Sequence, residues 1–137
     1  MENRRIMKFG YTIIYVQNVR ETLYFYEKAF GCAIRFLHPD NIYGELETGD
    51  TTLGFACEKY TFDIGVPTAL NRLKQGKLPS GVEIAFVTQD VQKAFEKAVE
   101  AGASPYKYPE KMYWGQTISY VQDLNGTLVQ ICTKHPS

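Results

Sequence analysis

The segment IIYVQNV at residues 13–19 returns 72 residues later as AFVTQDV at 85–91. Each copy is apolar enough to form a strand, and each ends in a residue that favours the start of a helix. Asn18 and Asp90 are these residues, because their side-chain oxygens accept hydrogen bonds from the amides of a first helical turn. A strand followed by a capped helix, twice over, indicates an internal repeat that organises the chain.

Apolar residues recur at helical spacing after each capping residue. Gly31 and Gly102 stand where the pattern stops, and glycine is the residue that most often ends a helix. In the first copy Glu21 lies three residues after the cap, as in a capping box, whereas the second copy has Lys93 there. The sequence therefore predicts one helix in each copy. The apolar positions are Val19, Leu23, Tyr26 and Phe30, and then Val91, Ala94, Phe95, Ala98 and Val99.

Strand-like segments separated by turns follow each predicted helix. The turns ETGDT at 47–51 and QDLNGT at 122–127 contain Gly-Asp and Asn-Gly pairs, which supply positive φ. The sequence thus predicts an α+β fold of two βαβββ modules in tandem. The predicted strands span 34–36, 42–47 and 51–57 in the first copy, and 104–108, 116–122 and 127–133 in the second.

A chain of 137 residues has the length of one domain. We expect a single domain over 1–137, with the first module over about 7–57 and the second over about 82–134. The segment between them, about 58–81, contains several prolines and glycines and is interpreted as a connector. Its most basic part, NRLKQGK at 71–77, is interpreted as a solvated face or a lid.

Composition excludes several classes of protein. Fifteen Lys and Arg balance fifteen Asp and Glu, so the chain lacks the positive charge that sequence-independent nucleic-acid binding needs. Its apolar runs are far shorter than a membrane span, and residues 1–8 lack the apolar stretch of a signal peptide. Cys32, Cys57 and Cys132 are an odd and widely spaced set, which suits a reducing compartment. We therefore expect a cytoplasmic protein without nucleic-acid or membrane partners.

Alternation along the strands predicts two different sheet faces. One face is apolar and is expected to pack under the helices. The other is mixed, with tyrosine, glutamate and glutamine among small residues, which is typical of a cavity or an interface. Its members are Tyr11, Ile13 and Tyr15, then Thr52, Gly54 and Ala56, then Glu83, Ala85 and Val87, and finally Leu128, Gln130 and Cys132.

The order of these motifs resembles the glyoxalase/bleomycin-resistance/extradiol-dioxygenase group, the vicinal oxygen chelate superfamily. The resemblance rests on QNVRETLYFY at 17–26, on Phe30-Gly31 closing the first helix, and on DLNG at 123–126 before the last strand. It covers about 7–134 and implies a cup-shaped, partly open mixed β-sheet barrel with the helices outside. It does not specify a function, because this fold hosts unrelated chemistries.

Enzymes of that family hold a divalent metal with one side chain from the first and last strand of each module. The corresponding positions are Tyr11, Gly54, Glu83 and Gln130. Only Glu83 is a good ligand, and one carboxylate does not replace three or four nitrogen and oxygen ligands. The two histidines, His38 in an apparent turn and His135 in the C-terminal tail, are expected to be exposed to solvent. We therefore expect no metal or other cofactor, unless the metal site is atypical.

The same residues suit a binding protein, as in members of the family that sequester a bulky ligand without a metal. Aromatic walls with one carboxylate favour planar or cationic organic ligands. We expect a homodimer that binds such a small molecule in an aromatic-lined cup. The expected ligand-binding residues are Tyr11, Tyr15, Tyr43, Gly54, Glu83, Tyr113, Trp114, Gln116 and Gln130.

Two other functions stay open at the level of sequence. Glu83 is the best single candidate for a catalytic base, in a lyase or isomerase or a dioxygenase-like enzyme with an atypical or absent metal. Alternatively, the mixed sheet face is only a dimer contact. Glu45 and Glu47 share a strand face and offer an acid–base pair, although an exposed strand face is the simpler interpretation. Motifs for a nucleophile elbow or a phosphate loop are absent from the sequence.

Overall fold

The computed structural model describes residues 7–65 and 75–136, which group into two compact units. Unit 1 holds the described residues 7–23 and 32–65, and unit 2 holds 24–31 and 75–136. The first helix therefore begins in unit 1 and ends in unit 2. Unit 1 does not coincide with the predicted first module, because the second half of this helix packs with the residues of unit 2.

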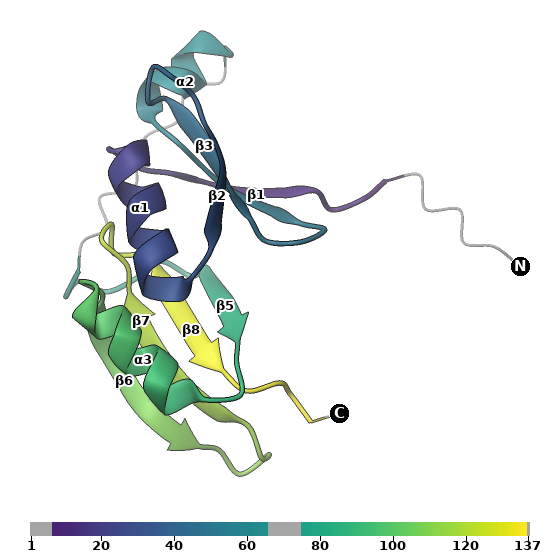
Figure 1. Cartoon of the computed structure of the whole chain (residues 1–137), viewed down its shortest axis with the longest axis vertical. Helices are drawn as coiled ribbons and strands as arrows, with labels where there is room; N and C mark the ends of the chain where they lie inside the picture. The colour runs from purple at the N-terminus through teal and green to yellow at the C-terminus, as the bar shows by residue number, and fades with distance from the viewer. Residues whose placement is uncertain (1–6, 66–74, 137) are drawn as a thin grey trace, which may run out of the picture. The chain divides into compact units, whose positions relative to one another are not determined.

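Unit 1 contains one four-stranded mixed sheet with the order β1-β4-β3-β2. Figure 1 labels β1, β2 and β3 of this sheet. Strands β1 and β4 are parallel, and the other neighbours are antiparallel. The sheet is open, with β1 and β2 at its edges. Its elements are β1 (Tyr11–Tyr15), the first half of α1 (Val19–Phe30), β2 (Ala33–Leu37), β3 (Tyr43–Glu47), β4 (Thr52–Ala56) and α2 (Glu58–Asp63).

Unit 2 repeats this topology with the order β5-β8-β7-β6. Here β5 and β8 are the parallel pair, and α3 packs on the sheet through contacts with β6, β7 and β8. Two βαβββ modules with two open mixed sheets confirm the predicted α+β class. The elements are β5 (Glu83–Val87), α3 (Val91–Glu100), β6 (Ser104–Lys111), β7 (Thr117–Gln122) and β8 (Leu128–Cys132).

The predicted helix boundaries are confirmed by their caps. The Asn18 and Asp90 side chains accept hydrogen bonds from the Glu21 and Lys93 amides, at 3.0 and 3.1 Å. Gly31 follows α1 with a φ of 73°. Each cap satisfies a backbone amide that the helix itself leaves without a partner.

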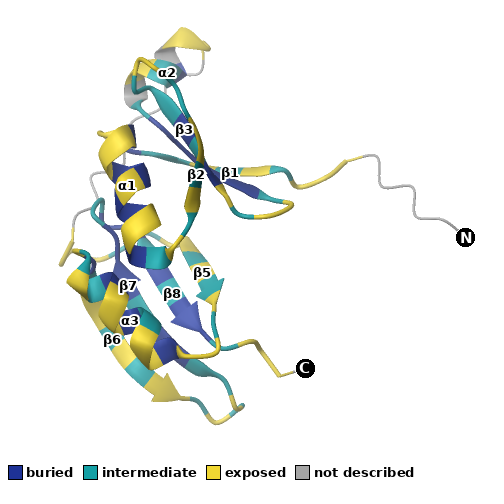
Figure 2. Cartoon of the chain, viewed as in Figure 1, coloured by how far each residue is buried: buried dark blue, intermediate teal, exposed yellow. Residues whose placement is uncertain are grey.

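The predicted division of the sheets into two faces is confirmed for β5 and for the middle of β8, but not for β4. Strand β5 alternates exposed and half-buried residues, with Ile84 and Phe86 on its more buried face. In β8, Val129 and Ile131 are buried, while Gln130 between them is only half-buried (Figure 2). Strand β4 differs, since all five of its residues are buried. Its Thr52 and Gly54 are contacted by side chains of β2 and β3, which the next subsection describes.

The Asp123 carboxylate joins α1 to the β7–β8 turn within unit 2. It accepts hydrogen bonds from the Tyr26 hydroxyl at 2.6 Å and from the Asn125 and Thr127 amides at 2.8 Å each. Asp123 and Tyr26 are both 0% exposed. Next to this contact, the Phe30 and Phe86 rings stack with their centroids 4.9 Å apart. The end of α1 is therefore held by both polar and aromatic contacts.

The segment predicted as a connector contains helix α2, which the sequence analysis did not predict. Six residues are too few for a helical period to stand out, and the prolines and glycines that follow dominate the pattern. Of the basic stretch at 71–77, the first four residues lie outside the described residues. Strand β6 is longer than predicted and has two register shifts in its pairing with β7. In the described chain, no helix is long and apolar enough to span a membrane.

Candidate functional site

The mixed face of unit 1 is built around Gly54 on β4. A side chain at this position would begin 3.0 Å from the Tyr43 hydroxyl, so Tyr43 covers the place that a side chain would take. Tyr43 lies on β3, and its hydroxyl donates to Glu45 Oε2 at 2.7 Å. Because residues i and i+2 share a face of a strand, this pair follows from the strand itself.

Two more tyrosines lie near Tyr43 in unit 1. Tyr60 on α2 stacks on the Tyr43 ring, with centroids 5.3 Å apart and 22° between the planes. Burial, then the hydrogen bond to Glu45, and then the nearby Tyr11 and Tyr60 raise the pKa of Tyr43 above its ordinary value. Tyr11 on β1 is 57% exposed. We call Tyr11, Tyr43 and Tyr60 the tyrosine cluster; it offers aromatic surface in unit 1.

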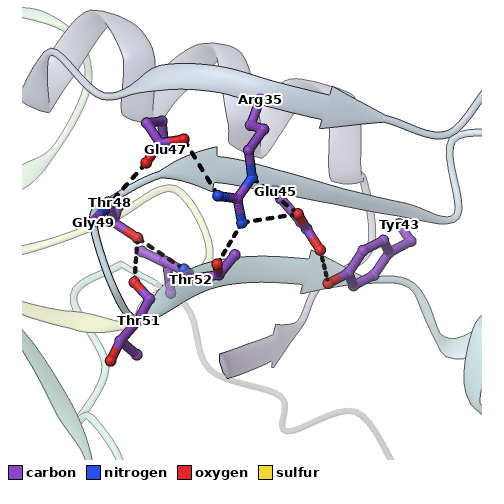
Figure 3. A network of polar contacts seen from close by, with 9 residues as sticks. Arg35, Tyr43, Glu45, Glu47, Thr48, Gly49, Thr51 and Thr52 are labelled. Carbon is purple, nitrogen blue, oxygen red and sulfur yellow. Dashed lines mark hydrogen bonds and ion pairs between the residues drawn. The ribbon is translucent and has the colours of Figure 1, made fainter. Parts of the chain in front are cut away.

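Arg35 on β2 forms ion pairs with Glu45 and Glu47 on β3 (Figure 3). Its guanidinium donates to Glu45 Oε1 at 3.1 and 3.2 Å and to Glu47 Oε1 at 3.3 Å, and it also donates to the Thr52 hydroxyl. Both oxygens of Glu45 are thereby engaged, one by Arg35 and one by Tyr43. The interpretation as an exposed strand face is right for Glu47 but not for Glu45, which is half-buried, and both carboxylates bind Arg35.

The mixed face of unit 2 carries a smaller polar group, Glu83, Tyr120 and Gln130, which we call the Glu83 triad. Gln130 Nε2 donates to Glu83 Oε2 at 2.6 Å and to the Tyr120 hydroxyl at 2.9 Å. The Tyr120 hydroxyl lies 3.4 Å from the same Glu83 oxygen. Burial, followed by the negative charge of Glu83, raises the pKa of Tyr120. The three side chains come from the adjacent strands β5, β8 and β7.

The predicted residues Tyr113, Trp114 and Gln116 lie in the hairpin between β6 and β7. The Trp114 indole donates to Gln116 Oε1 at 2.9 Å, and Gln116 Nε2 donates to the Thr133 carbonyl at 2.8 Å. Tyr113 is 96% exposed and meets the Trp114 ring edge to face. The side chain of Gln116 thus fastens the hairpin to the end of β8.

The structure brings the nine predicted ligand-binding residues together in three groups. Tyr11, Tyr43 and Gly54 share the face of unit 1, and Tyr15 follows Tyr11 along β1. Glu83 contacts Gln130 in unit 2, and the remaining three residues form the hairpin group. That one cup collects residues of both modules stays a prediction.

Three residues of these groups were missed from the sequence. Arg35 and Tyr60 depend on strand pairing and on the short helix α2, which local patterns do not reveal. Tyr120 was within reach, because it lies opposite Gln130 once β7 and β8 are aligned. The histidines take no part: His135 is exposed as predicted, whereas His38 is half-buried and accepts a hydrogen bond from the Asp40 amide.

A cavity of about 210 Å³ lies in unit 2, between the start of α3 and the ends of neighbouring strands. Asp90, Lys111 and Thr133 are among the residues that line it. None of the nine predicted residues does so. We therefore treat the tyrosine cluster of unit 1 and the Glu83 triad of unit 2 as two separate candidate sites.

The donors at the four positions that the resemblance implies for a metal do not form a suitable set. At Gly54 the space is taken by the Tyr43 hydroxyl, and the neighbouring Glu45 is engaged on both oxygens. Gln130 turns its amide nitrogen, which is no metal ligand, toward Glu83. In the part of the chain that the structure describes, no three His, Cys, Asp or Glu side chains gather. A divalent ion prefers three or four oxygen, nitrogen or sulfur ligands.

Comparison with known proteins gives a consistent result. Residues 8–131 match the sequence model of the Glyoxalase/Bleomycin resistance protein/Dioxygenase superfamily. Among curated proteins, no sequence is significantly similar to this chain.

Solved structures show the same fold at low sequence identity. A glyoxalase-related enzyme from Fulvimarina pelagi superposes with a TM-score of 0.77 and 18% identity, covering 94% of this chain and 89% of its own. A glyoxalase/bleomycin resistance protein/dioxygenase family enzyme from Burkholderia phytofirmans PsJN gives 0.75 and 20%, with coverages of 93% and 98%. A superfamily member from Sphaerobacter thermophilus gives 0.67 and 21%, with coverages of 94% and 98%.

Proposed function

Because the chain belongs to the Glyoxalase/Bleomycin resistance protein/Dioxygenase superfamily, whose fold hosts unrelated chemistries, we propose a function from its own residues. The protein binds a small planar organic ligand, and it does so without a metal ion. The tyrosine cluster carries this proposal. At Gly54, one of the four positions that correspond to metal ligands in the family, the Tyr43 side chain takes the place of a ligand side chain. Tyr11 of the same cluster is exposed to solvent.

The chemistry of the cluster favours a ligand that carries a flat aromatic group. Aromatic rings stack with offset or edge contacts, which stabilise a complex beyond the area that they bury. Tyr43 is held by Tyr60 on one side and by Glu45 at its hydroxyl, so little conformational freedom is lost on binding. Arg35 neutralises Glu45, which leaves the face without a free carboxylate at this point.

We further propose that two copies of the chain associate in a reducing, cytoplasmic environment. The three cysteines are free thiols, which supports the choice of compartment. In unit 1, Phe9, Tyr11 and Ile13 alternate along β1 and its approach, and all three are exposed. Exposed apolar residues on an edge strand are typical of an interface.

Metal content and chain number are measured together by native mass spectrometry, before and after dialysis against Ni, Mn, Zn, Fe and Co. We expect a mass of about twice 15.6 kDa, no stoichiometric metal, and no rise in the thermal unfolding midpoint with any of the five ions. A tightly bound ion that raises the midpoint would instead make chelate chemistry the leading function, and a single-chain mass would remove the dimer.

Ligand binding is tested with acridone, a planar and neutral fluorescent probe, against the Tyr11→Ala variant. Losing one stacking partner costs about 1 kcal/mol, so we expect roughly a fivefold weaker affinity in a fluorescence titration. Tyr106→Ala is the control, because Tyr106 is also exposed (47%) but lies on β6 of unit 2. Equal affinities of the two variants would show that the cluster does not bind the probe.

Catalysis by Glu83 is the second candidate function. It is favoured by one observation: Glu83 Oε1 has no hydrogen-bond partner among the described residues, while Oε2 is held by Gln130. Such a carboxylate is oriented and still able to accept a proton. Glu83→Gln distinguishes the two functions, because it leaves acridone binding unchanged in a binding protein but abolishes turnover in an enzyme.

A further inference from the structure

The Glu83 triad leaves two acceptor oxygens without partners. Gln130 Nε2 donates to both Glu83 Oε2 and the Tyr120 hydroxyl, which uses both hydrogens of the amide. This arrangement sets the orientation of the amide, because its oxygen would be repelled by the carboxylate. Among the residues that the structure describes, Glu83 Oε1 and Gln130 Oε1 accept no hydrogen bond.

Glu45, the carboxylate on the mixed face of unit 1, differs from Glu83 in its hydrogen bonds and in its charge balance. Glu45 faces Gly54 across β3 and β4, just as Tyr120 faces Gln130 across β7 and β8. Both oxygens of Glu45 are engaged, and Arg35 balances its charge. In unit 2 no cationic side chain forms an ion pair with Glu83 among the described residues. Glu83 is therefore the carboxylate of these faces that keeps both a negative charge and a free acceptor.

We propose that Glu83 and Gln130 recognise a cationic group of the ligand that carries at least two N–H hydrogens, such as an amidinium, a guanidinium or a primary ammonium. Tyr120 is the positioning residue that holds the Gln130 amide in this orientation. The proposal rests on the proposed function, since it names the chemical class of the small molecule that the protein binds.

Hydrogen bonding, rather than charge alone, makes this class specific. An exposed carboxylate attracts any cation only weakly in water. A charged donor that meets a carboxylate oxygen and an amide oxygen gains directional bonds that are about twice as strong as neutral ones. A quaternary ammonium has no N–H hydrogen and gains neither bond. A neutral amide donates to the oxygens but lacks the charge.

Three probes separate these contributions: benzamidine, benzyltrimethylammonium and benzamide. Each is titrated into the ¹⁵N-labelled full-length protein, and binding is followed through the amide resonances. We expect benzamidine to shift the resonances of 83, 120 and 130 saturably. We also expect it to bind about tenfold more tightly than either of the other two, which corresponds to one charge-assisted hydrogen bond.

Two variants and one control test the assigned residues. Glu83→Gln should weaken benzamidine binding about tenfold, whereas Glu100→Gln, which removes an exposed charge at the end of α3, should not change it. Tyr120→Phe keeps the ring but frees the Gln130 amide to rotate. It should lower the ratio of benzamidine to benzyltrimethylammonium affinity at least threefold, a ratio that a merely structural role would not change.

The outcomes separate this inference from the proposed function. Equal binding of benzamidine and benzyltrimethylammonium, or benzamidine binding that Glu83→Gln does not weaken, would overturn the inference. If the acridone titration still depends on Tyr11 in that case, the proposed function stands. If neither acridone nor benzamidine binds, both proposals fail.

Discussion

Replacing Asp123 by alanine is expected to lower the free energy of unfolding by about 3 kcal/mol or more. The carboxylate is fully buried and accepts hydrogen bonds from the Tyr26 hydroxyl and from the Asn125 and Thr127 amides. Removing it leaves three donors without their acceptor, and each such loss costs about 1–3 kcal/mol when the donor is shielded from water. Urea denaturation followed by circular dichroism measures the effect.

Asp123→Asn is the matched control, because an amide keeps an acceptor for the two backbone donors. We expect it to be much less destabilising at pH 7 than Asp123→Ala. Similar midpoints for Asp123→Ala and the wild type would contradict the prediction, since the three hydrogen bonds would then contribute little to stability.

The same residue predicts a pH dependence. Burial raises the pKa of Asp123 above its usual value of 3.8, although the Tyr26 hydroxyl and the surrounding amides oppose the shift. The folded state therefore binds the proton more tightly than the unfolded state does. The contribution of Asp123 to the free energy of unfolding is therefore fully present below pH 3.8. It is lost as the pH rises through the raised pKa that Asp123 has in the folded protein. The wild type should thus lose stability relative to Asp123→Asn as the pH increases across this window.

Replacing Gly44 by alanine is expected to destabilise unit 1 by about 1–3 kcal/mol, the usual cost of overpacking a core. Gly44 is buried on the face of β3 that meets α1. An added methyl group would contact Leu23 Cδ1 and lie 3.1 Å from the Phe36 carbonyl oxygen and 3.2 Å from Val19 Cγ1. The end of the Leu23 side chain can move aside. The Phe36 carbonyl oxygen cannot do so without a shift of β2, because it belongs to the backbone of that strand.

Gly10→Ala is the control for this variant. A methyl group at Gly10 meets nothing within 4 Å, so we expect a change below about 0.5 kcal/mol. Both variants are compared by urea denaturation under the same conditions. Equal stability of the Gly44 and Gly10 variants would mean that α1 does not pack on β3 as closely as described.

The repeat shows which parts of this fold were accessible from the sequence. Asn18 and Asp90 cap the helices that they were predicted to cap, and Gly49 and Gly126 adopt the positive φ expected of the two turns. These signals are local, because a cap or a tight turn depends on residues only a few positions apart. Helix α2 escaped prediction because six residues carry too little periodicity.

Some contacts of the candidate sites are local in sequence and could be predicted, whereas others depend on how the strands pair. The contact between Tyr43 and Glu45 spans two residues of one strand, so alternation alone places both on one face. The contacts of Gln130 with Glu83 and Tyr120 span 47 and 10 residues, and they depend on which strands are neighbours and in which register. The sequence shows only that Gly54 has no side chain, whereas the tertiary structure places the Tyr43 hydroxyl in the space that a side chain would take.

The sequence by itself therefore determined the two βαβββ modules with their capped helices and tight turns, since each follows from residue type and short-range spacing. Only the tertiary structure decided that Arg35 forms ion pairs with both Glu45 and Glu47. It also decided that, among the described residues, Glu83 Oε1 accepts no hydrogen bond. The physical reason is that partners for a charged group are chosen by strand order and register, which bring together residues that no local pattern connects.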